Sequence, residues 1–220
     1  MKNKLLTGLL GFFAAILIIT ISIGLPIYVR PFYYYQVDAL DIPSYSGADR
    51  ETIIEAYDEL LDYLTVPGNE FGTGDFKYSE NGKSHFVDCK VLFDLNLYAL
   101  LTSLVCVTVL MILKSRGVFE LWRPFGMSIL FSTGSFTLGG FVLIGGLAAL
   151  DFDKAFTIFH KLFFPGKENW IFSWHEDQVI RILPQAFFMN CAILILVSII
   201  ALCVAAIVYS VVEKNIKSSK

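Results

Sequence analysis

Residues 5–28 read LLTGLLGFFAAILIITISIGLPIY and carry no charged side chain. A helix needs about 20 consecutive apolar residues to cross the hydrocarbon core of a bilayer. Three further stretches are also free of charge, at 95–113, 124–150 and 182–212. The remainder of a chain of 220 residues could not cover four such helices in a soluble core. The sequence therefore predicts an all-α polytopic membrane protein with four transmembrane helices.

The N-terminus resembles a signal peptide, because Lys2 and Lys4 precede the apolar run. That run is longer than the apolar region of a signal peptide, and it continues into Tyr28 and Arg30 without an A-x-A cleavage site. We therefore expect a signal anchor that is retained.

The distribution of Lys and Arg predicts the orientation, because short cytoplasmic segments are rich in these residues. If four spans alternate, eight basic residues lie on one side of the membrane: Lys2, Lys4, Lys114, Arg116, Arg123, Lys214, Lys217 and Lys220. On the other side, residues 29–90 carry five basic and twelve acidic residues. We expect both termini in the cytoplasm and the segments 29–90 and 151–183 at the outer face of the membrane.

This topology divides the chain into four spans and the segments that connect them. The expected parts are transmembrane helices at 5–28, 91–113, 124–150 and 184–212, an extracytoplasmic cap at 29–90, a cytoplasmic turn at 114–123, a second extracytoplasmic segment at 151–183 and a cytoplasmic tail at 213–220.

An amphipathic helix is expected inside the cap. Ser46 with Asp49 resembles a helix N-cap signal, and Pro67-Gly68 ends the pattern. Apolar residues recur between these signals at helical spacing: Ile53, Ile54, Tyr57, Leu60, Leu61 and Leu64. We expect this face to lie on the membrane surface or on the tops of the spans, and residues 72–83 to form hairpin-like turns.

Composition disfavours several other classes of protein. The formal net charge is −3, and no basic patch is interleaved with aromatic residues, so a nucleic-acid partner is not expected. The four cysteines show no CxxC spacing and no pairing typical of a disulfide. Five glycines of the third span, at 134, 139, 140, 145 and 146, indicate close helix packing rather than a permeation path.

Two histidines flank the same membrane boundary. His85 precedes the second span, and His160 follows the third. Although they are 75 positions apart, we expect them to converge near the outer interface. A single histidine at such an interface is more often a structural hydrogen-bonding group than a catalyst. The interpretation as a catalytic site therefore depends on the presence of two histidines at the same boundary.

Polar and aromatic residues close to these histidines are candidate supporting groups. Asp88 would share a helical face with His85 and favour its protonated form. Asp177 and Arg181 have the spacing of a helical ion pair. Aromatic residues that could wall a pocket include Tyr33, Tyr34 and Trp170, although an ordinary interfacial belt would also explain them.

Four segments together resemble the lipoprotein intramolecular transacylase (Lit) family of Gram-positive bacteria: SHFVDCKVLF at 84–93, FHKLFF at 159–164, WIF at 170–172 and DQVIRILPQAFF at 177–188. The resemblance covers essentially the whole chain, and the two histidine-bearing segments are its specific part. His175 and Cys89 occupy positions that we expect to vary within the family.

The resemblance implies an acyltransferase that acts on a diacylglyceryl-modified lipoprotein. The acyl chain at the glycerol sn-2 position would move to the α-amino group of the N-terminal cysteine and give a lyso-form lipoprotein. The α-ammonium must lose a proton and the glycerol oxygen must gain one. His85 and His160 would share these roles as catalytic residues on opposite sides of a tetrahedral intermediate. Membrane lipids would be the surrounding partners, and no cofactor or metal would be required.

Two other functions stay open at this point. A metal-dependent membrane hydrolase could use His85, His160 and Asp88 as ligands. A non-catalytic transport or assembly subunit would need its histidines only as helix caps, although no span contains the internal charge that substrate paths often have.

Overall fold

The structure is a computed structural model that describes residues 2–218. The chain divides into two compact units. Unit 1 comprises Met1–Ile23, Asn96–Leu147 and Leu194–Lys220, and unit 2 comprises Gly24–Leu95 and Ala148–Ile193.

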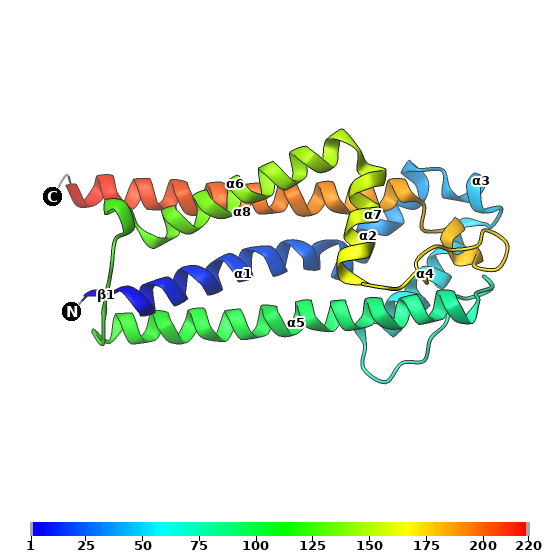
Figure 1. Ribbon diagram of the computed structural model, residues 1–220, viewed down its shortest axis with the longest axis horizontal. Helices are drawn as coiled ribbons and strands as arrows, with labels where there is room; N and C mark the ends of the chain where they lie inside the picture. Colours follow the sequence, from blue (N-terminus) through cyan, green and yellow to red (C-terminus); the bar gives the residue numbers. More distant parts are fainter. Residues whose placement is uncertain (1, 219–220) are drawn as a thin grey trace. The chain divides into compact units, whose positions relative to one another are not determined.

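Four helices are long and apolar enough to cross a membrane. They are α1 (Lys4–Tyr28), α5 (Glu80–Ser115), α6 (Ile129–Leu150) and α8 (Gln185–Ser218), which Figure 1 traces. Their apolar parts form unit 1. The expected fold class, an all-α membrane protein with four spans, is confirmed.

Two of these helices begin at residues that the sequence pattern does not indicate. α5 starts at Glu80, inside the segment expected to form turns, and continues without a break into the apolar stretch. α6 starts only at Ile129, because Pro124–Gly126 form a short 3-10 helix, η1, that stops before it. The side chains His85 and Asp88 therefore lie on α5 ahead of the span expected at 91–113.

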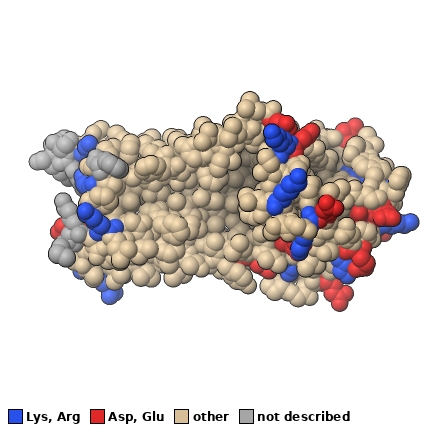
Figure 2. All heavy atoms as spheres, in the orientation of Figure 1, with Lys and Arg blue, Asp and Glu red and all other residues tan. Residues whose placement is uncertain are grey.

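One end of unit 1 gathers the N-terminus, the loop after α5 and the end of α8. Strand β1 (Lys2–Asn3) pairs in parallel with β2 (Glu120–Leu121), and the Lys4 ammonium lies 5.4 Å from the centroid of the Trp122 ring. Arg123 and Lys214 line one small cavity. Figure 2 shows Lys and Arg side chains gathered at this end and, next to it, a surface without charged residues. Lys220, the last basic residue of the expected tail, lies outside the described residues.

Close helix contacts in unit 1 use some of the small residues of α6. A Cβ added at Gly134 would lie 3.0 Å from the Cys203 carbonyl oxygen of α8, and one at Gly145 would lie 2.6 Å from Cδ2 of Leu196. Nothing lies within 4 Å of the corresponding positions at Gly139, Gly140 and Gly146. Two of the five expected packing glycines therefore contact α8, as small residues do where helices approach closely in lipid.

Unit 2 is built from shorter elements joined to the ends of the long helices. These elements are α2 (Arg30–Ala39), α3 (Ile42–Ser46), α4 (Arg50–Thr65), α7 (Phe152–Phe163) and the 3-10 helix η2 (Gln178–Arg181). Figure 2 shows many charged side chains on the surface of this unit.

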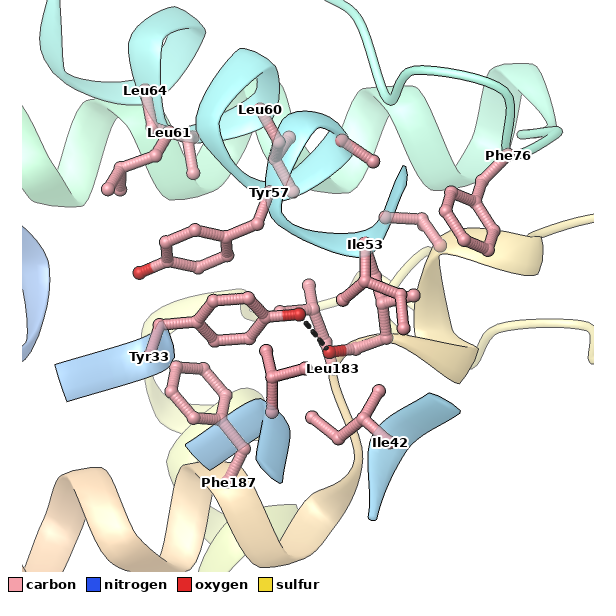
Figure 3. Close-up of a cluster of buried hydrophobic side chains, with 14 of the residues drawn as sticks. Tyr33, Ile42, Ile53, Tyr57, Leu60, Leu61, Leu64, Phe76, Leu183 and Phe187 are labelled. Carbon is pink, nitrogen blue, oxygen red and sulfur yellow. Dashed lines mark hydrogen bonds between the residues drawn. The ribbon is translucent and has the colours of Figure 1, made fainter. Parts of the chain in front are cut away.

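An apolar core holds unit 2 together (Figure 3). Tyr33 of α2 stacks on Tyr57 of α4 with ring centroids 3.6 Å apart, and Phe187 meets the Tyr33 ring edge-on. The Tyr33 hydroxyl donates a hydrogen bond of 2.7 Å to the Ile182 carbonyl. Ile42 and Val179 are fully buried in the same cluster. The core therefore joins two segments that are about 150 residues apart in sequence.

Helix α4 is the expected amphipathic helix, with one difference at its N-terminus. Asp49, not Ser46, caps it, because the Asp49 carboxylate accepts a hydrogen bond of 2.9 Å from the Thr52 amide. Ser46 instead ends α3. The apolar face of α4 packs into the core of unit 2, which includes Phe187 of α8 and has Phe93 of α5 packed against it, so it lies on the ends of two spans, the second of the two expected surroundings.

Candidate active site

The first turn of α5 fixes the position of His85. Ser79 precedes the helix, and its hydroxyl accepts a hydrogen bond of 2.9 Å from the Gly82 amide, which is the geometry of an N-cap. The buried carboxylate of Asp177 accepts hydrogen bonds from the Ser79 amide and hydroxyl, at 2.8 and 2.7 Å, and from the Ser173 amide at 3.1 Å. The start of α5 is thereby tied to the segment before η2.

His160 lies on α7, one turn after Phe156. Its Nδ1 is 2.8 Å from the Phe156 carbonyl oxygen, and a carbonyl can only accept, so Nδ1 carries the proton and donates it. The other ring nitrogen, Nε2, therefore has a free lone pair in the neutral imidazole. The hydrogen bond thus fixes the tautomer of His160.

The two imidazoles meet inside unit 2. Their ring centroids are 5.7 Å apart with an interplanar angle of 34°, and the residues are only 5% and 7% exposed. The expected convergence of His85 and His160 is thus present. Ring centroids at this distance are in direct packing range, which leaves no room for a substrate carbon between the rings. A substrate would have to lie against the pair, so the hypothesis that the histidines flank opposite sides of an intermediate is revised.

Aromatic side chains surround both imidazoles. The Trp170 ring stacks on the His160 ring with centroids 4.7 Å apart. The centroid of the Phe156 ring lies 4.2 Å from that of His160. Phe164 and Phe172 meet His85 edge-on at 4.9 and 5.5 Å. The Trp170 indole donates to the Lys167 carbonyl, so its ring is held in place. The shell is apolar on every side that these rings cover.

This apolar shell keeps the imidazoles neutral. Burial and, to a smaller extent, the neighbouring His160 together lower the pKa of His85 to about 4, and Asp88 opposes the change only in part. Burial also lowers the pKa of His160, against the hydrogen bond to Phe156. Asp88 does favour the protonated form of His85, as expected, but desolvation of the cation outweighs the attraction of the carboxylate, so the imidazole stays neutral.

Asp88 instead binds two residues of the segment that follows α7. It forms an ion pair with Lys167 and accepts a hydrogen bond of 2.9 Å from the Asn169 amide group. Burial alone would raise the pKa of Asp88, but these two hydrogen bonds outweigh it and the pKa lies below its usual value. Asp88 thus anchors the segment that carries Trp170.

The prediction of an ion pair between Asp177 and Arg181 is wrong, because each side chain has other partners. Asp177 precedes a 3-10 helix and has non-helical dihedrals, so its carboxylate points back to Ser79 and Ser173 rather than along a helical face. Arg181 donates to the Trp174 carbonyl and lies 5.2 Å from that indole ring. Asp177 therefore supports α5, while Arg181 holds the surface near Trp174.

Tyr33 and Tyr34 do not line the histidine site. Tyr33 belongs to the core of unit 2 described above, and the Tyr34 hydroxyl donates to the Asp58 carboxylate. Asp58 also pairs with Arg30 at 3.1 Å. Among the described residues, neither tyrosine ring is an aromatic neighbour of His85 or His160.

Four residues of the site were missed from the sequence: Phe156, Lys167, Asn169 and Cys89. Cys89 could have been found, because it follows His85 by four residues and so shares its helical face. Its sulfur lies 3.4 Å from Nε2 of His85. Phe156 has the same spacing before His160. Lys167 and Asn169 lie in a loop, where no periodicity indicates their direction.

A metal centre has little support in this geometry. Within residues 2–218, no group of three or more His, Cys, Asp or Glu side chains could hold a metal ion. In the alternative ligand set of His85, His160 and Asp88, the Asp88 carboxylate is not free to bind a metal, because it binds Lys167 and Asn169.

Two polar side-chain atoms of this region are buried without a hydrogen-bond partner: Nδ1 of His85 and Oδ1 of Asn169. No other such atom occurs in the part of the chain that the structure describes. A buried polar atom left unpaired costs about 1–3 kcal/mol. Such atoms are rare in folded proteins, and both lie at this site, because Asn169 contacts Ser84 and Asp88 beside His85. This is typical of a site that binds a polar ligand.

The fold and the site define an all-α membrane protein with two neutral histidines enclosed by aromatic rings. Comparison with known families goes further: the chain belongs to the lipoprotein intramolecular transacylase Lit family, whose model matches residues 8–188. It is therefore an enzyme, a lipoprotein intramolecular transacylase, and its location is a membrane.

Solved structures agree with this assignment. The chain is similar to the membrane integral lipoprotein intramolecular transacylase Lit from Bacillus cereus, with a TM-score of 0.86 and 25% identity over 98% of this chain and 96% of that chain. The same protein with an H85R mutation gives a TM-score of 0.79, at 25% identity over 97% and 94% of the two chains. Comparison with curated proteins gave no match.

Acidification is expected to destabilise the protein through His85. The unfolded imidazole has a pKa near 6.5 and the folded one about 4. Between these values the unfolded chain binds a proton that the folded chain does not, so the free energy of unfolding falls as pH falls through this window and is flat above it. Thermal unfolding in detergent at pH 4–7.5 measures the effect.

The matched variants are His85→Asn and His175→Asn. His85→Asn should show a shallower loss of stability below pH 6.5 than the wild type. The exposed His175 provides the control, and its variant should follow the wild-type profile. Parallel profiles for the wild type and His85→Asn would contradict this account.

Proposed function

We propose that this enzyme moves the ester-linked acyl chain at the sn-2 position of a diacylglyceryl lipoprotein to the α-amino group of its N-terminal cysteine. The observation that carries the proposal is the pair of buried imidazoles 5.7 Å apart in an aromatic shell. Family membership supplies the lipoprotein substrate class. The finer assignment of bond and histidine chemistry is our inference.

The reaction needs one group that accepts a proton. An α-ammonium has a pKa of about 7.7–8.0, so near neutral pH a usable fraction of the substrate already carries a free amine. When that amine attacks the ester carbonyl, its nitrogen must lose a second proton. The free Nε2 lone pair of His160 suits this role, because the bond from Nδ1 to Phe156 holds the ring in the required tautomer.

The lowered pKa values of both histidines fit this chemistry. A base that is already neutral at physiological pH needs no prior deprotonation. The aromatic shell also excludes water, which would otherwise hydrolyse the ester. Because amine and ester belong to one molecule, holding them together in this shell would supply much of the rate enhancement.

We propose that the site faces the outer side of the membrane. Basic residues of the N-terminus, the loop after α5 and the end of α8 gather at one end of unit 1, which is the pattern of a cytoplasmic end. With spans at 5–28, 91–113, 124–150 and 184–212, the segments 29–90 and 151–183 are extracytoplasmic. Lipoproteins are anchored by their acyl chains in the outer leaflet of the membrane, so the substrate would reach the site from that leaflet.

Reconstitution of the purified enzyme tests the function. The protein in lipid vesicles is incubated with a diacylglyceryl lipopeptide that has a free N-terminus, and the product is fragmented by mass spectrometry. We expect one acyl chain on nitrogen, one on glycerol and no change in total mass. A lipopeptide acetylated at its N-terminus is the control and should not react. Release of free fatty acid from both peptides would instead indicate a hydrolase.

A further inference from the structure

The hydrogen-bonding state of His85 raises a question that the proposed function leaves open. Its Nδ1 is buried without a partner, while Nε2 lies 3.4 Å from the sulfur of Cys89. A neutral imidazole has one donor nitrogen and one acceptor nitrogen. The partner at Nε2 therefore determines what Nδ1 can offer to a substrate.

Cys89 can interact with Nε2 in two ways. Its S–H group can donate to the Nε2 lone pair, or its sulfur can accept from Nε2–H. Burial raises the pKa of the Cys89 thiol to about 12, so the sulfur keeps its proton and has a hydrogen to donate. A thiol sulfur is a weak acceptor, whereas an imidazole nitrogen is a strong one. The first arrangement is favoured, and it leaves the proton of His85 on Nδ1.

We propose that Cys89 is a positioning residue that holds His85 in the tautomer with its proton on Nδ1, so that this N–H donates to the oxygen of the reacting ester carbonyl. The inference rests on the proposed function and deepens it. The unpaired Nδ1 atom then has its partner only when substrate is bound. Neutral imidazoles act as such donors in other enzymes, where they stabilise a developing oxyanion.

The assignment gives the two histidines different and complementary roles. The amine nitrogen attacks the carbonyl carbon, and one of its protons moves to Nε2 of His160. As the bond between this carbon and the glycerol oxygen breaks, the same proton moves from His160 to that oxygen. One amide and one hydroxyl replace one ester and one amine. His85 stabilises the carbonyl oxygen throughout and neither gains nor loses a proton.

A competing arrangement would use Cys89 as a nucleophile, with His85 as its base. A thioester on Cys89 would then carry the acyl chain between ester and amine. The raised thiol pKa and the lowered imidazole pKa disfavour the ion pair that activates such a cysteine. The protonation of the His85 ring nitrogens and a search for an acyl group on Cys89 separate the two arrangements.

The test combines nitrogen NMR with kinetics on the full-length protein in detergent. With ¹⁵N-labelled histidine, the spectrum distinguishes protonated from unprotonated ring nitrogens, and His85→Asn assigns the signals of His85. At pH 7.5 the wild type and Cys89→Ser should carry the proton on Nδ1. Cys89→Ala should give a mixture of tautomers. A wild-type proton on Nε2 would overturn the proposal, whatever the activity.

The kinetics use the same variants on the lipopeptide substrate. Cys89→Ala should lower kcat about three- to tenfold with KM unchanged, as expected for the loss of one hydrogen bond, and Cys89→Ser should restore most of it. Cys106→Ala on the same helix is the matched control and should match the wild type. Loss of all activity in both Cys89 variants, with an acyl group found on Cys89 of the wild type, would establish the thioester instead. Because the tautomer is read without substrate, its outcome is independent of whether the acyl shift itself is correct.

Discussion

Replacing His160 by Ala is expected to lower kcat by about 10²–10⁴, because general acid–base catalysis by a placed side chain contributes about that much. His85→Ala should lower it over a similar range if its N–H stabilises the oxyanion. Both residues act on one transition state, so the double variant should be little slower than the slower single variant. The measurement is the initial rate of N-acyl product formation by purified protein in vesicles.

Controls separate catalysis from folding in these variants. His175→Ala alters an exposed histidine and should keep the wild-type rate. Each variant should also show a cooperative thermal transition, since the cavity left by an imidazole is surrounded by rings such as Trp170 and Phe164 that remain in place. Wild-type rates in either His85→Ala or His160→Ala would remove that residue from the mechanism.

The second large effect concerns Asp177, which holds the start of α5. Asp177→Ala leaves the Ser79 amide, the Ser79 hydroxyl and the Ser173 amide without their acceptor. A hydrogen bond to a charged group contributes about 1.5–3 kcal/mol, so we expect a loss of about 3 kcal/mol or more in the free energy of unfolding. His85 would lose its alignment with His160, and the rate should fall as well. Thermal unfolding and product formation are measured on the same samples.

A second variant reaches the same contact from α5. A Cβ at Gly82 would lie 2.3 Å from Oδ1 of Asp177, so Gly82→Ala should displace the carboxylate and reproduce the Asp177 phenotype in milder form. Glu176→Ala removes the neighbouring exposed carboxylate and is the control. Equal stability of Asp177→Ala and Glu176→Ala would show that the contact contributes nothing.

The sequence predicted the parts of this structure that depend on composition and on local spacing. The four spans follow from uncharged stretches, and the apolar face of α4 follows from helical periodicity. The meeting of His85 and His160 followed from topology, since both lie next to the same boundary. None of these features requires knowledge of a distant contact.

The errors have one physical origin, which is competition from partners far away in sequence. Asp88 does share a helix with His85, but Lys167 and Asn169 reach it from about 80 residues away. Asp177 has the right spacing to pair with Arg181, but a 3-10 turn and the amides of Ser79 and Ser173 redirect it. The lowered pKa of His85 could not be predicted, because burial depends on how rings such as Phe164 and Phe172 pack against it in the folded chain.

The bond from the Tyr33 hydroxyl to the Ile182 carbonyl also sets the order in which the molecule can be assembled. The partners are 149 positions apart, so α2 and α4 leave the ribosome long before the segment that completes their core. Until the start of the last span emerges, the leucines of α4 and the Tyr57 ring lack part of their cover. Non-local cores of this kind form late and expose apolar surface in the interval. Folding of unit 2 is therefore completed only with the insertion of α8, and a chain truncated before Ile182 would leave the core of this unit unfinished.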